Sequence, residues 1–186
     1  MKKYFIPILI CALLSLSGCS ASTPTASAQT AITPQVDYFF TRAMQHPEKA
    51  LESQFNSAKS TLDIAIYSLT KRDIVDAILA AKKRGIKVRI ITDRIEAKSK
   101  AEATQLKRLK RAGIPIKENN HPGLMHMKVS IIDNAVVTTG SYNYTQAAST
   151  ENDEVLVVIH DSAIAQKWED EFQTMWNDTK NYSEIK

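Results

Sequence analysis

The chain has 186 residues, of which 24 are Lys or Arg and 20 are Asp or Glu, so its formal net charge is +4 at pH 7. A hydrophobic fraction of 44% and this balanced charge exclude an intrinsically disordered chain. Two cysteines are too few for a disulfide-dense scaffold or a four-cysteine zinc site. The length and the apolar content predict one globular domain with a core of its own.

The N-terminus has the pattern of an export signal. Lys2 and Lys3 precede an apolar run over residues 5–16, as in the charged and apolar regions of a secretory signal peptide. The stretch that follows, Leu16-Ser17-Gly18-Cys19, resembles the lipobox of bacterial lipoproteins. We therefore expect residues 1–19 to be a signal peptide, with cleavage after residue 28 as the alternative.

Either cleavage site would place the mature chain outside the cytoplasm. Lipidation of Cys19 would attach the protein to a membrane, and Ser20 behind it suits sorting to the outer membrane. We expect a periplasmic outer-membrane lipoprotein, with a soluble periplasmic or secreted protein as the alternative. Residues 20–35 are rich in Ser, Thr, Ala and Pro and predict a flexible leader ahead of a folded domain over 36–180.

Hydrophobic periodicity predicts the secondary structure of the domain. Strands are expected at residues 36–40, 62–69, 86–93, 114–116, 128–132, 135–139 and 154–159. Helices are expected at residues 47–58, 72–84, 101–112 and 162–176. Strands and helices alternate up to residue 116, whereas Asp133-Asn134 predicts a hairpin turn. We therefore expect an α/β fold with a mixed, mostly parallel β-sheet and helices on both faces.

The charges are distributed unevenly along the chain. Residues 82–117 hold 13 basic and 3 acidic residues, a net charge of +10, and residues 151–186 carry a net charge of −6. Such a basic block predicts a surface for nucleic acid, although Lys and Arg also solvate ordinary helix faces. The side chains expected to hold a nucleic-acid backbone are Lys98, Lys100, Lys107, Arg108, Lys110 and Arg111.

Two short blocks in the second half of the chain carry the chemistry. Residues 126–133 read H-x-K-x4-D, and residues 140–143 read G-S-x-N. Residues i and i+2 of a strand point to one face, so His126 and Lys128 would lie side by side. An imidazole can attack phosphorus while an ammonium neutralises the non-bridging oxygens of a phosphodiester. The amide of Asn143 and the hydroxyl of Ser141 can donate to the same oxygens.

A carboxylate behind the imidazole would hold its tautomer and stabilise its charged form. Glu154 lies eleven residues after Asn143, at the start of the next predicted strand. Asp133 belongs to the first block, but it lies five positions after Lys128, past the predicted strand and at the turn. Because Asp before Asn also favours a turn, Asp133 is a candidate for the chemistry or for local structure alone.

Together the two blocks resemble the signature of the phospholipase D superfamily, H-x-K-x4-D-x6-G-S-x-N. The chain is similar to the small bacterial endonucleases of that superfamily, which carry a single motif. The resemblance implies a phospholipase D-like α-β-α sandwich over residues 36–180, with Glu154 as the partner of the histidine. It implies no cofactor and no metal, and it assigns catalysis to His126, Lys128, Asn143, Glu154, Ser141 and Asp133.

The family mechanism uses two histidines, one that forms a phosphohistidine and one that protonates the leaving oxygen. The other histidines, His46, His121 and His160, are not followed by the x-Lys of the motif. The resemblance therefore implies a homodimer in which two copies of His126 share one active site. A metal bound by His121, His126 and Asp133 is an alternative that the positive charge of Lys128 disfavours.

Three functions remain open from the sequence. The first is an exported, metal-independent and non-specific endonuclease that cleaves DNA, with RNA as a further substrate; the basic block favours it. The second is a phospholipase D-type lipid hydrolase, which a lipid anchor at Cys19 would place beside its substrate. The third is a catalytically inactive module that binds nucleic acid or membranes.

Overall fold

The computed structural model describes residues 33–185, and the predicted signal peptide, the lipidation site at Cys19 and most of the leader lie outside them. The strands are β1 Gln35–Phe40, β2 Thr61–Ile66, β3 Lys87–Thr92, β4 Ile116–Asn119, β5 Lys128–Ile132, β6 Val136–Gly140, β7 Val155–His160 and β8 Tyr182–Glu184. The helices are α1 Pro47–Ser57, α2 Arg72–Lys83, α3 Lys100–Arg111, α4 Gln146–Thr150 and α5 Ser162–Asn177, with a 3-10 turn at Glu96–Lys98. Within the described range, no helix is both long enough and apolar enough to cross a membrane.

The eight described strands form one mixed sheet in the order β1-β7-β6-β5-β2-β3-β4-β8. Only β2–β3 and β3–β4 pair in parallel; the other neighbouring pairs are antiparallel. The expected mixed sheet is confirmed, but the expectation that it is mostly parallel is wrong. Helical crossovers through α2 and α3 return the chain in the same direction, whereas the tight turn between β5 and β6 reverses it.

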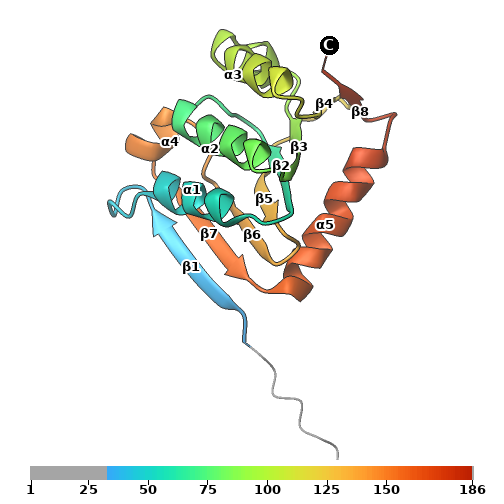
Figure 1. Ribbon diagram of the computed structural model, residues 1–186. Helices are drawn as coiled ribbons and strands as arrows, with labels where there is room; N and C mark the ends of the chain where they lie inside the picture. The colour runs from blue at the N-terminus through green and yellow to red at the C-terminus, as the bar shows by residue number, and fades with distance from the viewer. Residues whose placement is uncertain (1–32, 186) are drawn as a thin grey trace, which may run out of the picture. The chain divides into compact units, whose positions relative to one another are not determined.

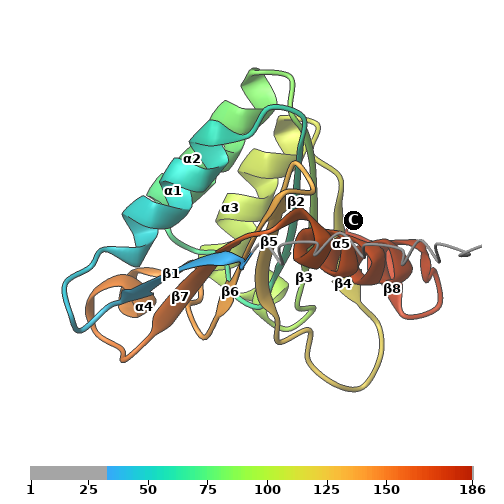
Figure 2. The same ribbon diagram turned by 90° about the horizontal axis from the view of Figure 1, so that it is seen from below.

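Helices cover both faces of the sheet, as expected (Figures 1 and 2). Helices α1, α2 and α3 lie on one face, over a core that includes Leu51, Ile78 and Leu106. Helix α5 lies on the other face, where Phe172 joins a second core with Val129, Ile131 and Val137. Because both faces are covered, the central strands β2, β3 and β5 are buried along most of their length.

A buried ion cluster attaches α5 to the sheet. The Arg89 guanidinium on β3 donates to Asp63 on β2 at 2.6 and 2.9 Å and to Glu169 on α5 at 3.0 Å. It also lies 4.9 Å from the centre of the Phe172 ring. Burial raises the pKa of Asp63 to about 6, although the hydrogen bonds from Arg89 oppose this shift. Arg89, although part of the basic block, therefore stabilises the packing of α5 on the sheet.

One edge of the sheet brings the motif residues together. Ile66 at the end of β2 pairs with Lys128 at the start of β5. Gly140 at the end of β6 pairs with Leu156, the second residue of β7. The residues just beyond these positions therefore meet at one edge, although up to 87 positions separate them in the sequence. The antiparallel register, which the sequence did not predict in full, is what assembles the site.

Candidate active site

The segment that carries the histidine runs into β5. His126 precedes the strand by two residues, and its side chain is exposed. The Lys128 side chain is buried, and its Nζ donates to the carbonyl oxygen of His126 at 2.8 Å. Met127, between them, packs against the core under α5 together with Val129 and Ile131. Met127 and Val129 thus face the core under α5, whereas His126 itself is exposed and lies outside the regular strand.

Tyr67, which the sequence motif does not include, contacts both motif residues. Its ring centre lies 4.5 Å from that of His126, with an angle of 57° between the ring planes. The Nζ of Lys128 lies 4.7 Å from the same ring centre. Tyr67 follows β2 directly, so the pairing of β2 with β5 places it here. Nothing in the linear motif indicates this neighbour; only strand order and register do.

The glycine of the second block allows β6 and β7 to come close together. Gly140 has φ of +132°, and a Cβ atom there would lie 2.2 Å from the carbonyl oxygen of Val155. That oxygen accepts the backbone N–H of Ser141 at 3.1 Å, and the Ser141 hydroxyl oxygen accepts the N–H of Val155 at 3.2 Å. The Ser141 side chain is exposed, and its hydroxyl hydrogen remains available to a ligand.

Asn143 holds an unsatisfied polar atom at this edge. Its Oδ1 is buried and has no hydrogen-bond partner among residues 33–185, while its backbone carbonyl accepts from Thr145 at 2.8 Å. Most buried polar atoms in proteins are hydrogen-bonded, so this unpaired oxygen is an exception. Asn143 as a whole is half-buried, and its amide N–H₂ group can donate to a phosphate oxygen.

Glu154 supplies a negative charge at the site. It is half-buried directly before β7, and its carboxylate accepts from Asn152 at 3.0 Å. Burial lowers the pKa of the Lys128 ammonium, and the charge of Glu154 opposes that shift. The two groups are therefore close enough to interact electrostatically. His126, Lys128, Asn143, Ser141 and Glu154 all lie at the same edge of the sheet.

Asp133 is the predicted residue that the structure does not bring to this edge. It lies at the far end of β5, about 17 Å from Lys128 at ~3.3 Å per residue. Its carboxylate accepts the backbone N–H groups of Lys59, Ser60 and Thr61 at 2.7–2.9 Å. Although burial would raise the pKa of Asp133, these hydrogen bonds lower it. Of the two roles considered for Asp133, its position supports the structural one.

The loop that leads to His126 is anchored by two buried polar residues. Asp93, directly after β3, accepts the N–H of Met125 at 2.9 Å. The side chain of Asn119, at the end of β4, donates to the carbonyl of Gly123 at 2.8 Å. Both anchoring residues have no exposed surface. Sequence reasoning did not find them, because a single Asp or Asn at the end of a strand carries no distinctive signal.

The alternative metal site is not assembled. His121 packs edge-to-face on Tyr182 with ring centres 5.8 Å apart, whereas Asp133 lies at the far end of β5 from His126. Among residues 33–185, no three His, Cys, Asp or Glu side chains are grouped to hold a metal ion. The expectation of a metal-independent reaction stays a prediction.

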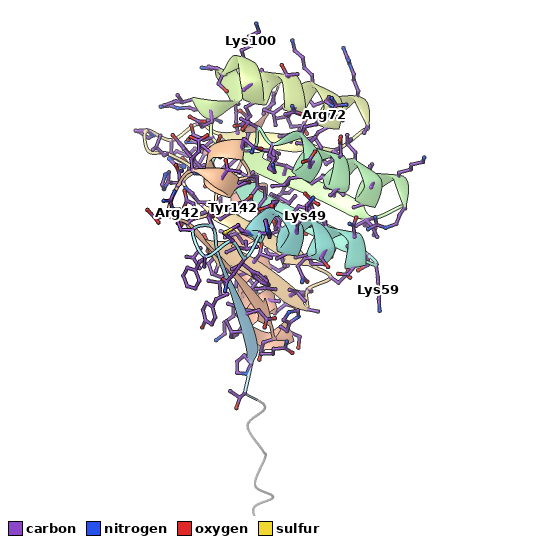
Figure 3. All side chains as sticks on the ribbon, turned by 90° about the vertical axis from the view of Figure 1, so that its left-hand side faces the viewer. Arg42, Lys49, Lys59, Arg72, Lys100 and Tyr142 are labelled. Carbon is purple, nitrogen blue, oxygen red and sulfur yellow. The ribbon has the colours of Figure 1, made fainter. Side chains whose placement is uncertain are left out.

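The six predicted nucleic-acid contacts divide into three groups. Lys98 and Lys100 are exposed at the start of α3, near the edge where β3 ends (Figure 3 shows Lys100). Lys107 and Arg111 are exposed about 10 and 16 Å further along the helix, at ~1.5 Å per residue. The remaining two have partners within the protein: Arg108 pairs with Asp76, and Lys110 donates to the carbonyl of Ile185. Fewer basic side chains of this block are thus free to contact a ligand than its net charge of +10 suggests.

Comparison with known proteins identifies the family. Residues 51–176 match the family model described as "Cardiolipin synthase, PLD-like domain". The fold is similar to that of a phospholipase D family member, Nuc from Salmonella typhimurium, with a TM-score of 0.74 and 34% identity over 80% of this chain and 98% of that one. The chain therefore belongs to the phospholipase D superfamily of phosphodiesterases, which confirms the resemblance of the motif and the fold.

Two curated relatives are named as lipid hydrolases. A mitochondrial cardiolipin hydrolase from Chlamydomonas reinhardtii is 32% identical over 65% of this chain and 53% of its own length. A phospholipase D from Rickettsia conorii is 36% identical over 64% of this chain and 59% of its own length. The chain thus spans between half and three fifths of the curated relatives it matches, and their names do not decide its substrate.

Proposed function

We propose that this protein is a metal-independent, non-specific endonuclease that cleaves DNA, and RNA as well, through a phosphohistidine in a homodimer. The observation that carries the proposal is the set of His126, Lys128, Asn143 and Glu154 at one edge of the sheet. Lys98 and Lys100 are exposed near the same edge, where they can contact phosphates on either side of the cleaved bond. The sequence contains no base-reading motif that we can identify, so contacts to the backbone and little sequence preference are expected.

In the proposed reaction, an imidazole nitrogen of His126 forms a bond to phosphorus while the bond to the leaving oxygen breaks. Lys128 and Asn143 hold the non-bridging oxygens, and no metal is needed to neutralise their charge. Glu154 stabilises a charged imidazole. A second histidine protonates the leaving oxygen and then takes a proton from water, which attacks the phosphohistidine and releases the second product.

The second histidine is proposed to be His126 of a second copy. The other three histidines have different surroundings. His46 pairs with Glu48, His121 packs on Tyr182, and His160 pairs with Asp37 at the far end of β7. A two-fold axis would place two copies of the exposed His126 on one phosphate, together with two copies of Lys128 and Asn143.

The test compares substrates in excess EDTA. The purified protein is incubated with plasmid DNA, with RNA and with cardiolipin vesicles, and His126→Ala is compared with the matched control His121→Ala. We expect cleavage of DNA and RNA in EDTA that His126→Ala lowers by about 10³-fold or more, since the nucleophile is removed, and that His121→Ala leaves within a few-fold. Size-exclusion chromatography with light scattering should show a dimer.

Each alternative gives a different result. Release of phosphatidic acid from vesicles without nucleic-acid cleavage would assign the protein to the lipid hydrolases, which the names of the two curated relatives support as the second candidate. Inactivity on all three substrates would favour a binding module. Loss of activity in EDTA would contradict the metal-independent mechanism.

We also propose that the protein is exported and anchored as a periplasmic outer-membrane lipoprotein through Cys19, with a soluble exported form as the alternative. The support is the sequence pattern of residues 1–19. Metabolic labelling with palmitate should mark the wild type and not Cys19→Ser. An unlabelled wild-type protein in the periplasmic fraction would favour cleavage after residue 28.

A further inference from the structure

The side chain of His126 has few constraints of its own. It is exposed, it precedes the regular part of β5, and neither of its ring nitrogens has a hydrogen-bond partner among residues 33–185. A surface histidine of this kind normally samples several rotamers. A nucleophile must instead keep its attacking nitrogen about 3–3.5 Å from phosphorus and in line with the leaving group. Another group must therefore hold the imidazole.

Tyr67 is placed to do so. Its backbone N–H donates to the carbonyl of Met127 at 2.8 Å, which ties it to the histidine segment. The next two residues, Ser68 and Leu69, are buried, and the N–H of Leu69 donates to the buried carboxylate of Glu102 at 3.0 Å. The backbone that carries the phenol ring is thus hydrogen-bonded on both sides, whereas the imidazole that lies against the ring has no hydrogen bond among residues 33–185.

The ring also connects the lysine and the histidine of the site. The Lys128 ammonium lies 4.7 Å from the centre of the Tyr67 ring and donates to the carbonyl of His126. An aromatic face attracts a cation, and an offset or tilted ring pair is favourable at a separation of 4.5 Å. Burial and the nearby Glu96 raise the pKa of Tyr67, so the phenol is neutral at pH 7 and adds no charge to the site.

We infer that Tyr67 is a positioning residue for phosphodiester cleavage: its aromatic face holds His126 in the orientation for attack and keeps Lys128 beside it. The inference rests on the proposed role of His126 as the nucleophile. It assigns the function to the ring and none to the hydroxyl, because the contacts to His126 and Lys128 are made with the ring.

Two substitutions separate the ring from the hydroxyl. Tyr67→Phe keeps the aromatic face, whereas Tyr67→Leu keeps an apolar side chain without an aromatic face. We expect Tyr67→Leu to lower kcat about 10- to 100-fold with KM changed less than about threefold, since misplacement by ~1 Å costs a factor of this order. Tyr67→Phe should stay within about threefold of the wild type. Both are measured with plasmid DNA and with bis(p-nitrophenyl) phosphate in EDTA.

A second measurement does not depend on turnover. The imidazole C–H resonances of His126, assigned by their loss in His126→Ala, should carry a ring-current shift in the wild type and in Tyr67→Phe. The shift should be lost in Tyr67→Leu while the melting temperature and the dimer stay unchanged. This readout distinguishes a positioning role from a general loss of structure.

Two results would overturn the inference. One is a Tyr67→Leu enzyme with wild-type kcat, and the other is an equal loss of kcat in Tyr67→Phe and Tyr67→Leu, which would make the hydroxyl the active group. If the His126→Ala variant remains active, the proposed role of His126 as the nucleophile is refuted, and the role of Tyr67 is not tested by kcat. In that case the resonances of His126 still decide whether Tyr67 orients the ring.

Discussion

Replacing Gly140 by Ala tests how the second block of the motif is built. A Cβ atom at this position would lie 2.2 Å from the carbonyl oxygen of Val155, and φ of +132° is a conformation that side-chain-bearing residues rarely adopt. The same oxygen accepts the N–H groups of Ser141 and Tyr142, at 3.1 and 3.3 Å. The added methyl group must therefore push β7 away from the turn that carries two predicted site residues.

The magnitude follows from two separate costs. Backbone strain at such a φ costs about 1–3 kcal/mol, and relieving a steric overlap inside packed structure costs about 1–3 kcal/mol more. For a domain of this size, each kcal/mol lowers the melting temperature by roughly 2–4 °C, so we expect a decrease of roughly 5–20 °C. A shift of Ser141 and Asn143 by ~1 Å would lower the rate of DNA cleavage about 10²-fold.

Gly113→Ala is the matched control. Gly113 also has a positive φ, +73°, but a Cβ atom there would meet nothing within 4 Å. Strain alone should cost about 1–2 kcal/mol, and cleavage should be unchanged because the residue lies beyond α3. Thermal unfolding by circular dichroism and plasmid nicking in EDTA measure both effects. The reasoning is refuted if Gly140→Ala melts no lower than Gly113→Ala and cleaves DNA at the wild-type rate.

Three further predictions concern stability and charge. Asp133→Asn should destabilise the protein by about 1–3 kcal/mol at pH 7 and leave cleavage intact. Because the folded-state pKa of Asp133 is lowered, the difference in unfolding free energy between wild type and variant, measured in urea, should shrink as acid protonates the wild type below about pH 4. A cleavage defect in the folded variant would show that Asp133 takes part in catalysis. Burial raises the pKa of Glu102 to about 7, although hydrogen bonds from Thr92 and Leu69 oppose this shift. The free energy of unfolding of the wild type should therefore fall as pH rises from about 4.5 to 7, by a few kcal/mol at ~1.4 kcal/mol per pKa unit. Glu102→Gln should flatten this pH dependence, and parallel stability curves for the two proteins would contradict the prediction. The double substitution Lys98→Ala/Lys100→Ala should weaken DNA binding and reduce the slope of log K against log salt concentration by about 2. Lys59→Ala is the control, since Lys59 lies past the end of α1 (Figure 3). Equal slopes for the wild type and both variants would exclude Lys98 and Lys100 as DNA contacts.

Much of the fold could be predicted because its signals are local. The four predicted helices begin and end within one residue of their predicted bounds, since α1 starts at a proline and α2 and α3 are followed closely by glycines. The strand direction was not predictable in this way: whether β7 runs parallel or antiparallel to its neighbours depends on where the chain places it. β8 lies beyond the predicted end of the domain at residue 180; it is itself an edge strand, and its three residues pair only with β4. Helix α4 is a five-residue turn without a periodic pattern.

For the basic block, too, the sequence shows one part of the picture and the structure another. Its position over residues 82–117 is visible in the sequence. The sequence does not show that Arg89 supports α5, that Arg108 pairs with Asp76 or that Lys110 holds the C-terminal segment. A long basic side chain pairs within the protein when a carboxylate or carbonyl lies within its reach. Whether one does depends on how the helices pack, which the sequence does not show.

By itself, the sequence of this protein indicated the chemistry: the order and spacing of His126, Lys128 and Asn143 already point to a phosphodiester site, because an imidazole that can attack phosphorus stands two positions from an ammonium that can neutralise its oxygens. Only the tertiary structure decided which other groups join them. The pairing of β2 with β5 brings Tyr67 onto His126, the end of β3 brings Asp93 to its loop, and the length of β5 holds Asp133 away. Contacts of this kind depend on strand order and register, which are set by the packing of the whole domain.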